Sequence, residues 1–335
     1  MLQRTSQPAA DPDAATFTGL VDRHRHELLV HCYRMLGSFE EAEDMVQETF
    51  LRAWRGRDAF EGRAALRTWL YRIATNACLD ASAKGRRPML LPTAETSARP
   101  ADSAWLQPFP DARLDPTTPH EEQPEARAVA RETIELAFLV ALQHLPPRQR
   151  AVLVLRDVVG CSAQEAADML EVTTASVNSV LQRARSTMRT HLPPRSRHEW
   201  SPSRDLAVPE QQVLDRFMVA VENADIAAIT DLISEDAVGC MPPYPMWYEG
   251  RDAIVEAVAG SFDTGADDYV GEFRLVATRA NGCPAAALYL RAPGDAAFQP
   301  WAINVLRVEH GRIVELTSFL SPQLFPAFGL PATLG

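Results

Sequence analysis

Prolines divide this chain of 335 residues into separate blocks. Seven of them fall between residues 92 and 124, among Thr, Ser, Asp and Glu. Such a composition cannot bury enough apolar surface for a core, so we expect an extended acidic tether. The predicted units are two all-α domains and a C-terminal α+β domain. Their bounds are 14–88, 131–195 and 206–332, with residues 89–130 as the linker.

The middle unit has the signals of two helices joined by a short turn. Pro146-Pro147 opens a preceding helix, and Gly160 ends it. Ser162 and Glu165 have the spacing of a capping box at the start of the next helix. A three-residue turn, 171–173, leads into the last helix, whose apolar stripe has the spacing i, i+3, i+4, i+7: Val177, Val180, Leu181 and Ala184. This pattern is typical of a helix-turn-helix, whose second helix enters the DNA major groove.

The face of that last helix opposite its apolar stripe carries the candidate residues for reading bases. They are Ala175, Asn178, Ser179, Gln182 and Arg183. Asn and Gln side chains pair with adenine edges and Arg with guanine. Three further arginines, Arg148, Arg150 and Arg185, are candidates for phosphate contacts. The alternative is a helical hairpin packed inside a larger α domain.

The N-terminal unit contains an acidic helical face followed by a basic and aromatic stretch. The acidic face holds Asp44, Gln47, Glu48 and Leu51, and it is either a solvated surface or a docking site for a partner helix. The stretch after it interleaves rings with cations, which suits unpaired bases on a phosphate backbone: Phe60, Arg63, Trp69, Arg72, Asn76, Lys84, Arg86 and Arg87. The alternative is that Trp69 packs in the core of a helical bundle.

Charge and cysteine usage limit the classes of function. The net charge of −11 argues against a nucleic-acid binder, but residues 207–335 alone carry −10. The five cysteines are scattered without metal-ligand spacing, which favours a reducing cytoplasm and no metal or other cofactor. No long apolar run or signal-peptide pattern indicates a membrane partner.

The order of these signals resembles the extracytoplasmic-function (ECF) group of the sigma-70 family. The similar segments are Met35 to Trp54, Arg67 to Asp80 and Leu145 to Arg185. The last unit resembles SnoaL-like members of the nuclear-transport-factor-two-like superfamily, through Met241 to Gly250 and Phe325 to Pro331. Many ECF recognition helices carry Lys or Arg where this chain has Asn178 and Val180, so a distinct −35 preference is expected.

The resemblance implies a transcription initiation factor that is not itself an enzyme. It would dock on core RNA polymerase through the acidic face, melt the −10 promoter element with the residues from Phe60 to Arg87, and read the −35 element with the helix-turn-helix. The C-terminal domain would regulate activity through intramolecular contact with the other units. A small ligand could occupy a pocket lined by Met241, Pro243, Trp247, Tyr248 and Trp301.

The alternative function is a small-molecule-converting enzyme, or a ligand sensor, fused to a DNA-binding module. An enzyme of that kind needs a general base held in an apolar pocket. The candidates are Asp231, Asp236 and His310.

Overall fold

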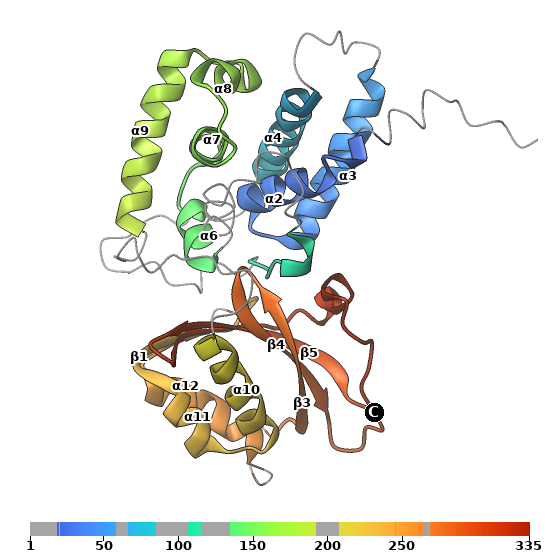
Figure 1. The fold of residues 1–335 in the computed structure, drawn as a ribbon, viewed down its shortest axis with the longest axis vertical. Helices are drawn as coiled ribbons and strands as arrows, with labels where there is room; N and C mark the ends of the chain where they lie inside the picture. The colour runs from blue at the N-terminus through green and yellow to red at the C-terminus, as the bar shows by residue number, and fades with distance from the viewer. Residues whose placement is uncertain are drawn as a thin grey trace, which may run out of the picture.

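The computed structural model describes residues 19, 21–57, 66–84, 106–114, 135–191, 208–244, 246–263, 265 and 269–335. In Figure 1 these residues form an upper helical half and a lower half built around a sheet. The upper half consists of an N-terminal bundle and a middle block, and the lower half is the C-terminal domain. The two all-α units and the α+β unit expected from the sequence are therefore confirmed.

The N-terminal bundle packs its helices around an apolar core. Its elements are α2 (Arg25–Leu36), α3 (Phe39–Arg55) and α4 (Leu66–Lys84). Gly37 ends α2 with a φ of 72°, and the Ser38 side chain caps α3 by accepting from the Glu41 amide. Leu28, Leu36 and Leu70 are fully buried between the helices.

The middle block has the helix-turn-helix that the sequence predicts. Its elements are α6 (Leu136–Gln143), α7 (Pro147–Leu153), the π-helical turn η4 (Val154–Val158), α8 (Ala163–Leu170) and α9 (Thr174–His191). The capping box of α8 is present, with Ser162 and Glu165 each satisfying the other's backbone amide. Glu171 ends α8 with a φ of 55°, in the left-handed region.

The C-terminal domain lays three helices on one face of a six-stranded sheet. The helices are α10 (Val208–Glu222), α11 (Ile226–Leu232) and α12 (Arg251–Ala259), with the short 3-10 turn η5 (Gly260–Phe262) after α12. The strands are β1 (Ile233–Cys240), β2 (Trp247–Glu249), β3 (Glu272–Ala280), β4 (Cys283–Arg291), β5 (Gln299–Glu309) and β6 (Arg312–Phe319). A further 3-10 segment, η6 (Pro322–Phe328), follows β6.

The sheet order is β2-β1-β6-β5-β4-β3. Strands β3 to β6 form an antiparallel meander. Strand β1, by contrast, pairs parallel to β6, so the sheet is mixed. The sequence did not predict this pairing, because nothing local to β1 specifies which edge it joins.

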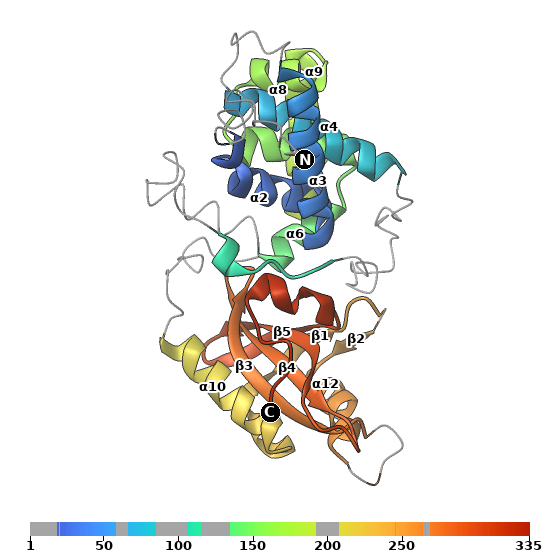
Figure 2. The same ribbon diagram turned by 90° about the vertical axis from the view of Figure 1, so that its right-hand side faces the viewer.

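Part of the linker is packed, against the expectation of an extended tether. Residues 106–114 lie between the helical half and the sheet, where they include the 3-10 turn η3 (Asp111–Arg113) (Figure 2). Leu106 and Phe109 are buried, and Pro110 forms a bridge with Ala280 at the end of β3. The expectation was wrong here because four buried apolar residues, Leu106, Pro108, Phe109 and Pro110, are enough to dock a short segment on an existing surface.

Candidate nucleic-acid interface

Helix α9 has one apolar face and one polar face. Val177, Leu181, Ala184 and Met188 are buried against the rest of the middle block. The opposite face is exposed and holds the predicted base-reading residues: Ala175, Asn178, Ser179, Gln182 and Arg183. The Thr173 hydroxyl accepts a hydrogen bond of 3.1 Å from the Ser176 amide at the start of the helix. The structure thus brings all five predicted residues to one accessible surface.

The three arginines expected to hold phosphates have different surroundings. Arg148 is exposed on α7. Arg185 is exposed and forms a bidentate ion pair with Asp157, at 2.7 and 2.8 Å. The hydrogen bond to Asp157 raises the pKa of Arg185, so its guanidinium remains charged.

The structure contradicts the prediction that Arg150 contacts a phosphate. Its side chain is buried, and it donates hydrogen bonds to the carbonyl oxygens of Leu142 and Leu145 at 3.0 and 3.1 Å, and of Gln143 at 3.4 Å. It also donates to the carbonyl oxygen of Met35 in α2. A phosphate cannot reach it in this arrangement, so Arg150 joins the middle block to the N-terminal bundle.

Three of the predicted −10 residues share one face of α4. Trp69, Arg72 and Asn76 follow the spacing i, i+3, i+7, and Lys84 is exposed in the last turn. Trp69 is half-buried against the core, and the rest of its ring is accessible. Phe60, Arg63, Arg86 and Arg87 lie outside the described residues.

A buried carboxylate fixes the first turns of α4 to α2. Glu27 accepts hydrogen bonds from Arg67 at 2.7 Å and from the Tyr71 hydroxyl at 3.1 Å, and it also contacts His24. Burial alone would raise the pKa of Glu27, but the hydrogen bond with His24 and the charge of Arg67 outweigh it and lower that pKa. The anchored end of α4 is the one that carries Trp69.

Residues of the acidic face of α3 lie together as predicted. Asp44 and Gln47 are exposed, and half of the Leu51 surface is accessible. Glu48 pairs with Arg52 at 2.7 Å, and this hydrogen bond lowers the pKa of Glu48. The face therefore combines exposed negative charge with one apolar side chain.

The five residues predicted to line a pocket do not converge. Tyr248 packs on the helix-covered face of the sheet, whereas its neighbour Trp247 in β2 points to the opposite face. Pro243 and Trp301 are exposed, and Met241 is half-buried. Among the described residues, no cluster of His, Cys, Asp or Glu could hold a metal ion. None of the described helices is long and apolar enough to cross a membrane.

Known proteins match each of the three units. Residues 20–87 match the model of sigma-70 region 2, residues 135–188 that of sigma-70 region 4, and residues 214–316 that of the SnoaL-like domain. The ECF RNA polymerase sigma factor SigG of Mycobacterium tuberculosis is 42% identical over 100% of this chain and 89% of its own length. The chain belongs to the ECF family of RNA polymerase sigma factors.

Two further similarities support the assignment of the units. The sigma factor SigW of Bacillus subtilis is 31% identical over 57% of this chain and 97% of its own length. The crystal structure of the M. tuberculosis sigma factor SigJ matches 95% of this chain and 99% of its own, with a TM-score of 0.58 and 23% identity. This second match shows that a known sigma factor shares the three-unit fold.

The sequence interpretation missed a contact that joins three parts of this sigma factor. We call Tyr33, Gln107, Phe109, Asp111 and Asn281 the docking contact. The Asn281 side chain donates to the Tyr33 hydroxyl at 2.8 Å and accepts from the Phe109 amide at 2.8 Å. The Tyr33 hydroxyl donates to the Gln107 carbonyl at 2.7 Å, and Asp111 accepts from the Gly282 amide at 2.9 Å. Asn281-Gly282 is a dipeptide typical of a hairpin turn, but no sequence signal identifies the partners of this turn.

Proposed function

We propose that this sigma factor directs core RNA polymerase to promoters and that its C-terminal domain regulates this activity from within the chain. The main support is the exposed polar face of α9, on a capped helix-turn-helix. In this proposal α9 enters the major groove at the −35 element, and the face of α4 binds the melted −10 element.

The base-reading role of α9 makes a specific prediction. Arg183→Ala should relax the preference at one −35 position by about 1–3 kcal/mol, because one bidentate contact with a guanine is lost. Binding of holoenzyme to a library of promoter fragments measures the preference at every position. Equal weakening on all fragments would instead place Arg183 on a phosphate.

The acidic face of α3 is the proposed docking site on core polymerase. Its exposed carboxylates suit a basic partner, and Leu51 offers an apolar contact. The double change Asp44→Lys and Glu48→Lys should abolish core binding and run-off transcription while circular dichroism stays unchanged.

A matched control changes the same charge on another surface. Asp231→Lys with Glu256→Lys alters two exposed carboxylates of the C-terminal domain, and this variant should bind core polymerase as the wild type does. If the α3 variant binds core polymerase as tightly as the wild type does, the acidic face of α3 is not the docking site. Failure of the wild type to bind core polymerase would refute the whole function.

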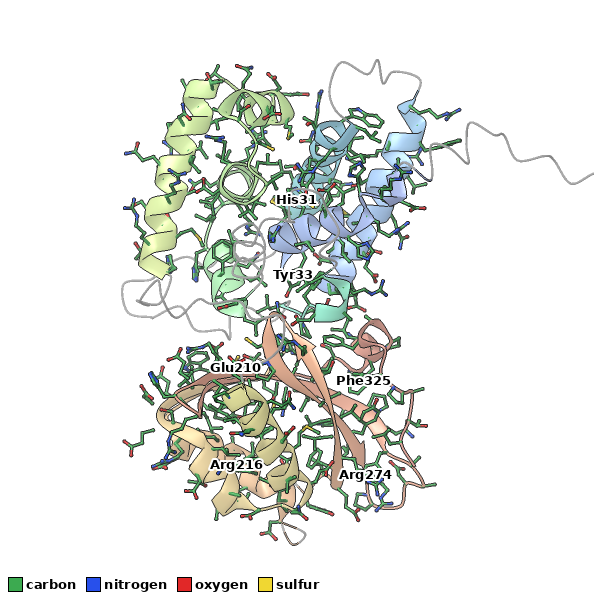
Figure 3. The ribbon with its side chains drawn as sticks, viewed as in Figure 1. His31, Tyr33, Glu210, Arg216, Arg274 and Phe325 are labelled. Carbon is green, nitrogen blue, oxygen red and sulfur yellow. The ribbon has the colours of Figure 1, made fainter. Side chains whose placement is uncertain are left out.

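The docking contact supports regulation by the C-terminal domain. Tyr33, Phe109 and Asn281 are fully buried, and they belong to the N-terminal bundle, the linker and the C-terminal domain respectively. Figure 3 shows Tyr33 at the lower edge of the helical half, facing the sheet. Because the linker segment is held between two domains, a signal that moves the C-terminal domain also changes where the linker can go.

Disruption of the docking contact should therefore change transcription without touching the DNA-reading faces. Asn281→Ala removes the side-chain hydrogen bonds at the tip of the β3–β4 hairpin. The matched control is His310→Ala, which alters the equivalent residue of the β5–β6 turn, also at positive φ but exposed. Equal run-off yields from both variants and wild type would argue against regulation through this contact.

The catalytic alternative has little support in the site geometry. Asp231, Asp236 and His310 are all exposed, whereas a general base of this kind needs an apolar pocket. We therefore assign the C-terminal domain a regulatory role and no reaction.

A further inference from the structure

An ion pair connects the two helices that this sigma factor uses to read DNA. The guanidinium of Arg72, on the −10 face of α4, lies 2.9 Å from a carboxylate oxygen of Glu171. Glu171 is in the turn that precedes α9, three residues before the first residue of that helix. Figure 1 shows α8, which Glu171 ends, beside α4.

This arrangement is incompatible with binding to both promoter elements. The −35 and −10 elements are named for positions about 25 base pairs apart, which is roughly 85 Å at about 3.4 Å per base pair. Here the −10 helix instead lies near the start of the −35 helix, where the ion pair adds to the apolar packing between the two units. The pair must therefore break before the sigma factor can engage a promoter.

Two properties of Glu171 suggest that its side chain serves this contact. Its carboxylate occupies the guanidinium of Arg72, which would otherwise be available to a DNA phosphate oxygen. Its backbone is also in the left-handed region, with a φ of 55°, where glycine or asparagine is typical at the end of a helix. A glutamate at such a position gains nothing from the local backbone.

We infer that Glu171 is an intramolecular substitute for a DNA phosphate: it occupies Arg72 in the free sigma factor and adds to the packing that keeps the two DNA-reading helices together until polymerase separates them. This inference rests on the proposed function, because it requires Arg72 to contact the −10 element. The pair is exposed, with 48% of the Arg72 side chain and 74% of the Glu171 side chain accessible. Exposed pairs are weak and sensitive to salt, which suits a contact that must open.

The experiment measures the affinity of full-length variants for core RNA polymerase by fluorescence anisotropy at low and high salt. Glu171→Gln should bind core about two- to fivefold more tightly than wild type at low salt, because the closed arrangement is weakened. The advantage should disappear near 1 M salt, where the Debye length is only about 3 Å. The control Asp168→Asn removes an exposed carboxylate from the same helix-turn-helix and should leave the affinity unchanged.

A double-mutant cycle separates the ion pair from a general effect of charge. In an Arg72→Gln background, Glu171→Gln should have no effect on core affinity. The inference is overturned if Glu171→Gln matches wild type at low salt, if Asp168→Asn gives the same gain, or if the gain persists without Arg72. Wild-type protein that does not bind core at all would instead refute the proposed function, so the two failures are distinguishable.

Discussion

The N-terminal bundle makes two contacts of different chemistry. With the linker and C-terminal domain it shares a buried hydrogen-bond network, and with the middle block it shares an apolar core that has a solvent-exposed ion pair at its edge. In the first, the Asn281 side chain donates a hydrogen bond to the Tyr33 hydroxyl, and neither side chain is exposed to solvent. In the second, Arg72 and Glu171 pair in solvent, whereas Arg150 and the shared apolar core are buried. A buried network depends on geometry, because each missing partner leaves an unsatisfied group, whereas an exposed pair can open and close at low cost.

The difference suggests a division of roles. The docking contact holds the C-terminal domain and linker on the bundle, while the contact with the middle block can be released. Arg150 fits this division because, among the described residues, it donates to the carbonyls of Leu142, Gln143 and Leu145 in its own block as well as to Met35. On separation it would lose the Met35 carbonyl and keep those of its own block.

The largest effect is expected at Arg150. Arg150→Met should lower the free energy of unfolding by about 3–5 kcal/mol, because several buried carbonyl groups lose their donor. Arg148→Met, two residues earlier on the exposed side of α7, should change it by less than about 0.5 kcal/mol. Urea denaturation compares the two variants. Similar small effects for both would show that Arg150 does not hold the middle block together.

A smaller effect is expected at the docking contact. Asn281→Ala should destabilise the docked arrangement by about 2–3 kcal/mol, because the buried Phe109 amide loses its acceptor and alanine tolerates positive φ poorly. His310→Ala also places alanine at a positive φ but removes no buried hydrogen bond, so it should lower the free energy of unfolding by about 1 kcal/mol. Hydrogen exchange of residues 106–114 reports undocking. Equal exchange in both variants would place the docking energy elsewhere.

A fall in pH should weaken the docking contact and the contact with the middle block together, because both need a folded N-terminal bundle. Burial lowers the pKa of His31 from 6.5 to about 3. Between these values the unfolded chain binds a proton that the folded chain does not, so stability falls as the pH drops below 6.5, at up to about 1.4 kcal/mol per pH unit. Figure 3 shows His31 inside the helical half.

Denaturation at pH 6.5 and 5.5 measures this dependence. His31→Gln should flatten it, whereas His26→Gln, a change at an exposed histidine of the same helix, should not. An unchanged slope in the His31 variant would assign the acid sensitivity to another group.

The sequence by itself determined the units, most of the secondary structure and the polar face of α9. These features are local. A capping box, a glycine at the end of a helix and the spacing of apolar residues each involve only a few neighbouring residues, so they can be recognised in the sequence. The predicted residues of α3 and α9 lie together for the same reason. The parallel pairing of β1 with β6 and the packed linker segment were decided only in three dimensions.

Tertiary structure also decided which charged groups are available. Arg148 and Arg150 have the same side chain two residues apart, yet one is exposed and the other is buried. Arg72 meets Glu171 across 99 residues of sequence, and Tyr33 meets Asn281 across 248. Partners so distant leave no periodic signal, because their meeting depends on how whole domains pack.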